Sequence, residues 1–204
     1  MIQIWKACGM DLDNVEFIWA SDEINARSEE YWSLVLDIST QFNLSRIKRC
    51  CTIMGRKESD ELGASQIFYP CMQCADIFFL KANIAQLGMD QRKVNMLARE
   101  YSNLKKMKHK PIILSHHMLM GLKQGQEKMS KSDPDSAIFM EDTVADVKRK
   151  IKKAYCPPQI IKDNPCIDYF KYIVFNKFDK VTIQRKEEYG GNKEYNDYPL
   201  FEKD

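Results

Sequence analysis

The sequence predicts an α/β fold that is followed by a mainly helical, basic segment. Residues 15–20 (VEFIWA) are apolar and rich in β-forming side chains, and a run with helical spacing follows at 28–42. Farther along, a helical pattern at 90–104 leads into a short apolar run at 110–115 (KPIILS). Strands that alternate with helices in this way are typical of α/β proteins.

The apolar side chains of each expected helix fall on defined faces. On one stripe of the first helix lie Tyr31, Leu34, Val35 and Ile38. Segment 66–82 (QIFYPCMQCADIFFLKA) has apolar residues on several faces, which indicates a largely buried helix. Asp90 suits the N-cap of the helix at 90–104. The apolar face of that helix carries Val94, Leu97, Ala98 and Tyr101.

A polar segment separates these elements from the basic part of the chain. Residues 118–142 are mostly Gly, Lys, Gln, Ser, Asp and Pro, and a connection of that length usually serves a function. Thr143 and Asp146 then form a capping-box pattern for a basic helix. Another helix would open at residues 164–165 (Asn-Pro), and a strand is expected at 181–186 (VTIQRK).

Composition limits the classes to which the chain can belong. Of its 204 residues 44% are apolar, which is enough for a core, and the charge is uneven: residues 1–88 carry 8 basic and 12 acidic side chains (−4), and residues 89–204 carry 23 and 17 (+6). We expect domains at 1–142 and 143–204, with any anionic partner meeting the second half.

Seven cysteines without a signal-like N-terminus indicate reduced thiols and a cytoplasmic location. No apolar run approaches the about 20 residues that a membrane helix needs.

Cysteine and histidine pairs offer weaker signals. The C-x-x-C at residues 71–74 would suit zinc or a redox centre, but zinc needs two further ligands, and the other close pair, at 50–51, lacks the usual spacing. Buried thiols and no bound metal are the favoured interpretation. His116 and His117 would point to opposite sides of a strand, so a metal or general-base pair gains little support.

Three polar side chains interrupt the apolar helix at 66–82. Tyr69, Gln73 and Asp76 are spaced i, i+4 and i+7, so they share one stripe of the helix. A carboxylate is costly to bury without a partner. The plainer interpretation is a core tyrosine with two polar groups that the backbone satisfies, and the sharper one is a pocket wall for a small polar ligand.

Two further segments could bind an anion. At QLGMDQRK (86–93), Gly88 ends an apolar segment and a helix opens, which brings free N–H groups near the Asp90 side chain, although ordinary capping explains this as well. In EKMSKS, Lys128 and Lys131 lie beside serine hydroxyls on a polar loop, as suits polyphosphate. A solvated lysine loop has the same composition.

The KMSKS at 128–132 matches the signature loop of class I aminoacyl-tRNA synthetases, and the surrounding pattern resembles tyrosyl-tRNA synthetases of the eukaryotic and archaeal type. YPCMQCAD (69–76) resembles their tyrosine-pocket helix, and LGMDQRKVNMLARE (87–100) resembles their ribose and substrate segment. KIKKAYCPP (150–158) and EYGGNKEY (188–195) resemble the domain that follows. The likeness runs in order over most of the chain.

The resemblance implies a fold and a tyrosine pocket. The fold would be the C-terminal part of a doubly wound, Rossmann-like catalytic domain, followed by the start of a mainly helical anticodon-binding domain. By similarity, Tyr69 and Gln73 would hold the amino group of the substrate tyrosine. Asp76 would accept its phenol hydroxyl, and Gln91 would line the same pocket.

The resemblance also implies a nucleotide site and a reaction. Gly88 and Asp90 would approach the ATP ribose, and Lys128 and Lys131, with Ser130 between them, would bind the phosphates. The tyrosine carboxylate would attack the ATP α-phosphate, with Mg²⁺ on the phosphates, and tyrosine would then pass to tRNA(Tyr). The substrate brings its own nucleophile, so the reaction requires no triad and no general base.

The chain departs from the family pattern in one motif. The family carries an H-x-G-H signature near the start of the nucleotide fold, and that spacing does not occur in this sequence. The likeness begins in the middle of the catalytic domain and stops part way into the next, so we expect a fragment truncated at both ends. In the family, an insertion that corresponds roughly to residues 28–65 forms the interface of a homodimer, and we expect dimerisation of the complete protein.

Two other readings remain open at this point. Tryptophanyl-tRNA synthetase shares the fold, the loop and the chemistry, and Asp76 could equally accept an indole N–H. A non-catalytic RNA-binding or interaction module would explain the basic second half and the missing H-x-G-H. The retained set of pocket residues counts against a module of that kind.

The missing motif leads to a first prediction. The isolated 204-residue chain should not form tyrosyl-adenylate, because half of the nucleotide site would lie outside it. The measurement is ATP–pyrophosphate exchange with tyrosine, and exchange above the blank would refute the prediction.

Overall fold

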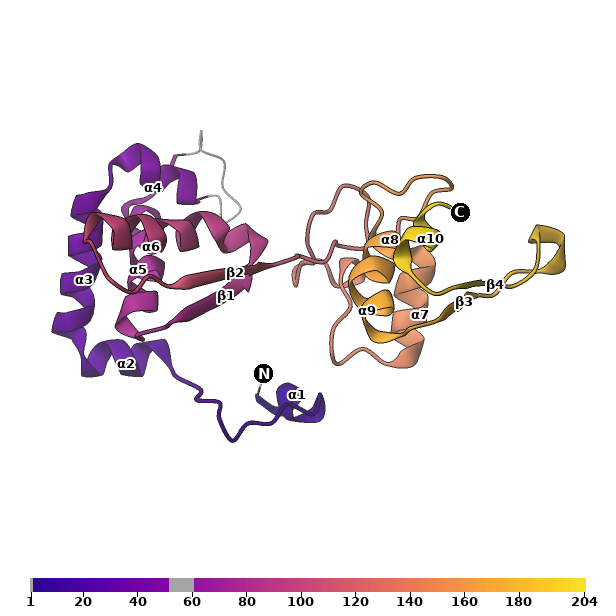
Figure 1. Ribbon diagram of the computed structural model, residues 1–204, viewed down its shortest axis with the longest axis horizontal. Coiled ribbons are helices and arrows are strands. Elements are labelled where there is room, and N and C mark those ends of the chain that lie inside the picture. Colours follow the sequence, from indigo (N-terminus) through magenta and orange to yellow (C-terminus); the bar gives the residue numbers. More distant parts are fainter. Residues whose placement is uncertain (1, 52–60) are drawn as a thin grey trace. The chain divides into compact units, whose positions relative to one another are not determined.

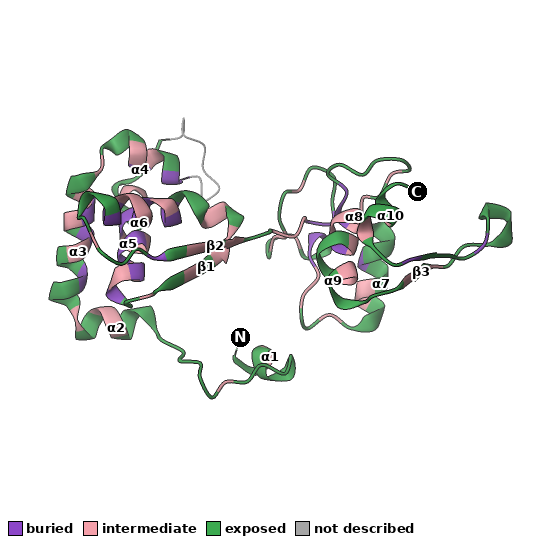
Figure 2. Cartoon of the chain, in the orientation of Figure 1, coloured by how far each residue is buried: buried purple, intermediate pink, exposed green. Residues whose placement is uncertain are grey.

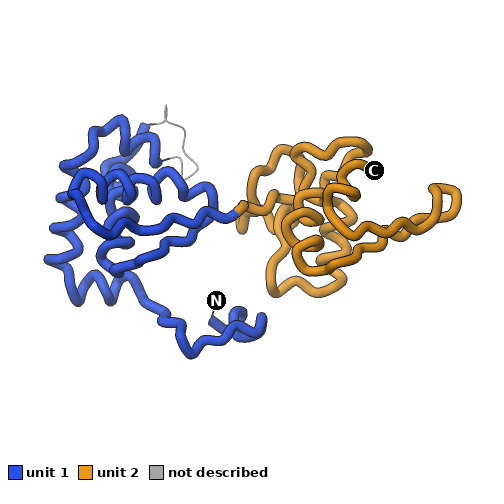
Figure 3. Tube along the Cα trace, viewed as in Figure 1, with its two compact units in different colours: residues 1–116 blue, residues 117–204 orange. Residues whose placement is uncertain are grey.

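The computed structural model describes residues 2–51 and 61–204, which form two compact units, residues 1–116 and 117–204 (Figure 3). Residues 52–60 of the expected dimer insertion at 28–65 lie outside the described residues. The units divide between His116 and His117, whereas the sequence placed a domain boundary between residues 142 and 143.

Unit 1 is a helical layer against a parallel strand pair (Figure 1). Its helices are α1 (Ile2–Ala7), α2 (Ala20–Ala26), α3 (Ser28–Gln41), α4 (Leu44–Cys50), α5 (Ala64–Phe79) and α6 (Arg92–Leu104). Its other elements are β1 (Ile84–Gly88), the 3-10 turn η2 (Met89–Gln91) and β2 (Ile112–His116). The helices expected at 28–42, 66–82 and 90–104 and the strand expected at 110–115 are confirmed.

The two strands of unit 1 are parallel, with Ile84 opposite Ile112 and Gly88 opposite His116. Parallel neighbours need a crossover, and α6 provides it. Ala85 of β1 and Ile113 of β2 pack against the core of the unit. This βαβ arrangement confirms the α/β prediction and brings the end of β1 to the start of α6.

Helix α5 lies at the centre of this core, with α3, α4 and α6 packed against it (Figure 1). Buried positions concentrate on these helices, as the purple segments of Figure 2 show. Tyr31, Val35 and Ile38 of α3 are 1%, 0% and 0% exposed, and Val94, Leu97, Ala98 and Tyr101 of α6 are all buried. The apolar faces predicted for α3 and α6 are therefore the ones that the fold buries.

A proline inside α5 requires a compensating donor. Pro70 has no N–H, so the carbonyl of Gln66, four residues earlier, loses its helical hydrogen bond. The thiol of Cys51, which follows α4, lies 3.4 Å from this carbonyl and 3.5 Å from the carbonyl of Ile47, and its single proton is shared between the two. A cysteine from another segment thus fills the gap that the proline makes.

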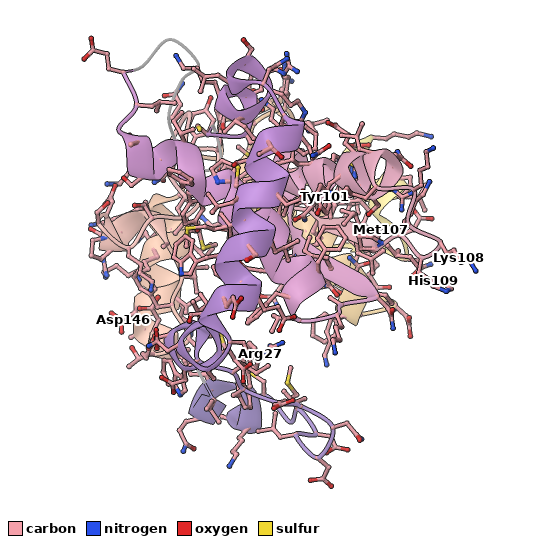
Figure 4. All side chains as sticks on the ribbon, turned by 90° about the vertical axis from the view of Figure 1, so that its left-hand side faces the viewer. Arg27, Tyr101, Met107, Lys108, His109 and Asp146 are labelled. Carbon is pink, nitrogen blue, oxygen red and sulfur yellow. The ribbon has the colours of Figure 1, made fainter. Side chains whose placement is uncertain are left out.

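Polar side chains tie the surface edges of the helices together. Arg46 of α4 makes a bidentate contact with Glu100 of α6, with both N···O distances 2.8 Å. Tyr101 of α6 lies beside α3 (Figure 4), and its hydroxyl donates to Asp37, which also pairs with Lys105 at 2.8 Å. These contacts hold α6 to α3 and α4.

Two sequence predictions for unit 1 are wrong. Residues 15–20 form no strand: the segment is exposed up to Trp19, which is 74% exposed, and no strand of the described residues lies beside it. An apolar β-rich run becomes a strand only where a neighbour pairs with it. Asp90 does not cap α6, because η2 precedes the helix and Gln91 takes the N-cap position without a side-chain cap bond.

Unit 2 consists of short helices and one hairpin. Its elements are η3 (Pro134–Ser136), α7 (Val144–Lys153), α8 (Pro165–Tyr169), the π-helical turn η4 (Phe170–Val174), α9 (Phe175–Lys177), β3 (Val181–Ile183), η5 (Glu187–Tyr189), β4 (Lys193–Tyr195) and α10 (Tyr198–Glu202). The strands are antiparallel. Thr143 and Asp146 form the predicted capping box of α7, and α8 opens at 164–165 as expected, with Asn164 as its N-cap. The strand expected at 181–186 is only Val181–Ile183.

Segment 117–142 belongs to unit 2 because it packs on α7. The Lys150 ammonium group, in a residue only 4% exposed, donates to the Ala137 carbonyl (2.9 Å) and to Asp142 (2.6 Å). The Tyr155 N–H donates to the Leu122 carbonyl at 2.8 Å. Long polar segments read as linkers in a sequence, but this one supplies part of the core of its unit. Whether 1–142 and 143–204 act as functional domains stays a prediction.

No helix of the described residues is long and apolar enough to cross a membrane.

The Pro70–Cys51 arrangement yields a testable coupling. Cys51→Ala should lower the free energy of unfolding by about 1 kcal/mol, because a partly buried carbonyl loses its donor. In a Pro70→Ala background, residue 70 can donate to Gln66 itself, so the same change should cost less. Urea unfolding of both single variants and the double variant measures the difference.

Cys51→Ser keeps a donor of similar size and is the matched control for that cycle. Equal costs of Cys51→Ala in both backgrounds would contradict the coupling.

Candidate functional site

Two of the residues expected to line the tyrosine pocket meet between α5 and η2. Gln73 of α5 donates from Nε2 to Oε1 of Gln91 at 3.1 Å, and both side chains are partly buried. Gln91 reaches this position because β1 ends at Gly88 and η2 turns the chain into α6. Paired amides leave hydrogen-bonding capacity at each end, so this pair can still donate to and accept from a ligand.

Asp76, one turn after Gln73, is the charged group of this stripe. Burial raises the pKa of its carboxyl group, and the hydrogen bond from Tyr31 partly opposes this. The Tyr31 hydroxyl donates to Asp76 Oδ1 at 3.0 Å. Burial and the Asp76 charge together raise the pKa of Tyr31, so the phenol stays protonated and can only donate in this contact.

The second oxygen of Asp76 is free to accept another donor. Among the described residues no side chain or backbone N–H donates to Oδ2, and Asp76 is not fully buried. Tyr69, on the same stripe, is 48% exposed and is therefore not the core tyrosine of the plainer sequence interpretation. The stripe thus has a partly buried end at Asp76 and an exposed end at Tyr69.

The expected ribose segment lies at the end of the strand pair. Gly88 ends β1 opposite His116, with φ −60° and ψ 157°, and Asp90 lies in η2 and is partly buried. The structure therefore brings Gly88, Asp90 and Gln91 to one turn, at the carboxyl end of a parallel strand. Ligands of open α/β sheets bind at this end of the strands.

The expected phosphate loop lies in unit 2. Lys128 and Lys131 are exposed, and the hydroxyls of Ser130 and Ser132 are 2.8 Å apart. The backbone N–H of Asp133 donates to the Ser130 carbonyl at 3.3 Å, which makes a turn after the lysines. The loop thus presents ammonium and hydroxyl groups to solvent.

The chain entering this loop is anchored to α8 by one carboxylate. Asp168, whose side chain is 11% exposed, accepts from the Met120 N–H at 3.2 Å and lies 2.8 Å from His117 Nε2. The His117 ring also stacks on Tyr172, with centroids 3.7 Å apart, and the Tyr169 hydroxyl donates to the Met120 carbonyl at 2.7 Å. His117 is thus engaged in unit 2, while His116 ends β2 of unit 1.

The C-x-x-C cysteines are buried in the core of unit 1. Cys71 is 2% and Cys74 0% exposed, and burial raises the pKa of Cys71 to about 11 and that of Cys74 still further. Both therefore stay protonated thiols at neutral pH. Within residues 2–51 and 61–204, no group of three or more His, Cys, Asp or Glu side chains is arranged to hold a metal ion.

Sequence reasoning missed two residues near the pocket stripe. Tyr31 was assigned to the core, and no local signal links it to Asp76, 45 positions away. Asn95 lies one turn after Gln91 and is 0% exposed, and neither of its amide atoms has a hydrogen-bond partner among the described residues. A polar residue on the apolar face of α6 was the available signal for Asn95.

Comparison with known proteins places these features in a family. The family model of class I tRNA synthetases for tryptophan and tyrosine matches residues 1–204. Among curated proteins, tyrosine–tRNA ligase 1, cytoplasmic, of Arabidopsis thaliana is 66% identical over 196 residues, or 96% of this chain and 51% of the relative. The tyrosine–tRNA ligase of Saccharolobus solfataricus is 40% identical over 99% of this chain and 59% of its own length. The chain thus spans about half the length of these relatives.

Solved structures agree with this assignment. Tyrosyl-tRNA synthetase of Leishmania major in complex with tyrosinol is 53% identical, with a TM-score of 0.83, over 99% of this chain and 31% of that one. The L-tyrosine complex of the Pyrococcus horikoshii enzyme is 34% identical, with a TM-score of 0.84, over 98% and 60%. A tryptophanyl-tRNA synthetase from Aeropyrum pernix shares the fold at 19% identity and a TM-score of 0.59. The chain has the Rossmann-like fold of these enzymes, and it belongs to the class I tRNA synthetase family of the tryptophan and tyrosine enzymes.

Proposed function

We propose that this chain is part of a tyrosine–tRNA ligase, which activates tyrosine with ATP to tyrosyl-adenylate and transfers it to tRNA(Tyr). The observation that carries the proposal is Asp76, a partly buried carboxylate with one oxygen held by Tyr31 and the other without a donor among the described residues. The names of the similar plant and archaeal enzymes support the same assignment.

The pocket would recognise tyrosine through both ends of the substrate. Asp76 accepts the phenol hydroxyl, and Tyr69 and Gln73 hold the ammonium group, with Gln91 lining the pocket through its bond to Gln73. Phenylalanine would bury the Asp76 acceptor without supplying a donor, and an unpaired buried polar group costs about 1–3 kcal/mol. The pocket would therefore select tyrosine over phenylalanine, because phenylalanine removes water from the Asp76 carboxylate without replacing its hydrogen bond.

The reaction relies on position and charge. Gly88 and Asp90 contact the ATP ribose, and Lys128, Ser130 and Lys131 bind its phosphates, where charge develops as pyrophosphate leaves. Mg²⁺ would accompany ATP as part of the substrate. The tyrosine carboxylate is the nucleophile, so these residues orient reactants and stabilise charge without forming a covalent intermediate.

The partners of the enzyme follow from the same assignment. We propose tRNA(Tyr) as the macromolecular substrate, since the second half of the chain carries the excess of basic residues. A homodimer and a cytoplasmic location are part of the proposal, and the name of the Arabidopsis relative supports the location.

Tyrosine should stabilise the protein expressed from its full reading frame, and tryptophan should not. At one hundred times its Kd, a ligand that binds only the native state adds about 2.7 kcal/mol to the free energy of unfolding. Thermal unfolding with each amino acid measures this effect. Stabilisation by tryptophan alone would favour the tryptophan enzyme, and stabilisation by neither would favour a non-catalytic RNA-binding module.

Asp76→Asn should stabilise the protein without ligand but weaken tyrosine binding by roughly 10- to 150-fold, as expected when a hydrogen bond to a charged group is lost. The raised pKa of Asp76 means that its ionised form opposes folding. The stability gain should therefore be present at neutral pH and shrink as the pH falls toward 3.8. Unfolding across this pH range, with tyrosine titrations, measures both effects.

Asp37→Asn is the matched control for that experiment. Lys105 first, and then Tyr101, hold the pKa of Asp37 below its usual value, so its ionised form favours folding. This variant should lose stability at neutral pH, the loss should fade as the pH drops through the lowered pKa, and tyrosine binding should not change. A gain of stability in both variants would contradict the assignment for Asp76.

A further inference from the structure

Two thiols that the proposed reaction does not use lie together in unit 2. Cys156 follows helix α7 and is exposed, whereas Cys166 lies in the first turn of α8 and is only partly exposed. The Cys156 thiol lies close enough to the Cys166 thiol to contribute to the raised pKa of Cys166. The loop between them is closed, so that residue 166 lies near residue 156, ten positions earlier in the sequence.

A buried amide holds this loop closed. Asn164 is 2% exposed, and its Nδ2 donates to the Ile160 carbonyl at 2.8 Å and to Cys156 Sγ at 3.5 Å. Its Oδ1 accepts the N–H of Cys166 at 3.0 Å. One side chain thus contacts both cysteines, so their proximity is a property of the folded loop.

The pair differs from the other cysteines of the described residues in access. Cys50 and Cys51 are buried and donate to backbone carbonyls, and the core also encloses the C-x-x-C thiols at 71–74. Cys8 is exposed, but it lies in the N-terminal segment of unit 1. Cys156 and Cys166 therefore combine an accessible thiol with a second thiol close by.

We propose that Cys156 and Cys166 form a reversible redox site, which a low-molecular-weight disulfide such as glutathione disulfide oxidises to an intramolecular disulfide. The Cys156 thiolate attacks one sulfur of glutathione disulfide, that S–S bond breaks, and one glutathione leaves with the Cys156 proton. Cys166 then attacks the Cys156 sulfur of the mixed disulfide. The second glutathione leaves with the Cys166 proton. Two cysteine thiols are oxidised, and one glutathione disulfide is reduced to two glutathiones.

The environment of each thiol sets the order of the steps. Burial, and then the neighbouring Cys156 thiol, raise the pKa of Cys166 to about 11, so it is a poor first nucleophile at neutral pH. Cys156 is exposed, so a dissolved disulfide can reach its sulfur, which the Asn164 amide holds in place at 3.5 Å. Cys166 serves as the resolving thiol because Asn164 holds both cysteines in one closed loop.

The sequence provides a direct assay for this disulfide. Lys162 lies between the two cysteines, so trypsin places them in separate peptides, 154–162 and 163–171. The 204-residue chain is equilibrated in glutathione buffers of increasing oxidised fraction, quenched with acid, alkylated with N-ethylmaleimide, digested and analysed by mass spectrometry. The expected product is the cross-linked pair, two hydrogens lighter than the summed reduced peptides, and dithiothreitol should reverse it.

Two controls distinguish a disulfide that depends on the folded loop from non-specific oxidation of thiols. In Cys166→Ser, Cys156 should stop at the mixed disulfide with glutathione, as the exposed Cys8 should in every oxidising sample. In urea, the cross-link should fall by about ten-fold relative to other pairings, because the effective concentration of the thiols is lost. Wild-type protein that carries glutathione on Cys156 without the cross-link, or a cross-link equally abundant in urea, would overturn the proposal. The assay needs neither tyrosine nor ATP, so its outcome is independent of the proposed function.

Discussion

Burial of helix α5 on three sides is the constraint on which unit 1 depends. Since α3, α4 and α6 all pack against it, the polar groups on its inner faces depend on partners from the protein. Pro70 leaves the Gln66 carbonyl without a helical donor, and Asp76 loses solvation. Donors from other segments compensate for both losses: the thiol of Cys51 bonds to the Gln66 carbonyl, and the hydroxyl of Tyr31 bonds to Asp76. The central helix therefore dictates which polar groups its neighbours present, and the pocket stripe is one result.

The sequence pattern predicted an element correctly wherever the side chains that it marks as apolar are the ones that the fold buries. The apolar spacing of α3 and α6 and the capping box before α7 describe interactions within a few residues, and the structure has all three. The run at 15–20 shows the limit, because strand formation depends on a neighbour that composition does not reveal. Gln73 and Asp76 could be placed on one stripe from spacing alone, but the bond from Tyr31 could not, since it depends on how α3 packs on α5.

Few apolar side chains of unit 2 are fully buried, and polar anchors order much of the unit. Asp168 fixes both His117 and Met120, Asn164 closes the loop after α7, and the buried Lys150 ties the polar segment to α7. Each of these side chains makes two or more contacts, so few residues order a long irregular segment. These few anchoring contacts explain why a region that looks like a linker in the sequence is part of a compact unit.

The acids of the SDPD sequence give the lysine loop a property that its basic residues alone would not have. Asp133 lies 2.6 Å from Lys123, and Asp135 lies 2.8 Å from Arg149, so these two carboxylates act as internal counter-ions. A polyanion that binds here displaces protein carboxylates from these two cations, in place of salt ions from solution. The salt dependence of binding should therefore be shallower than the local number of positive charges implies, because fewer ions are released to the solvent.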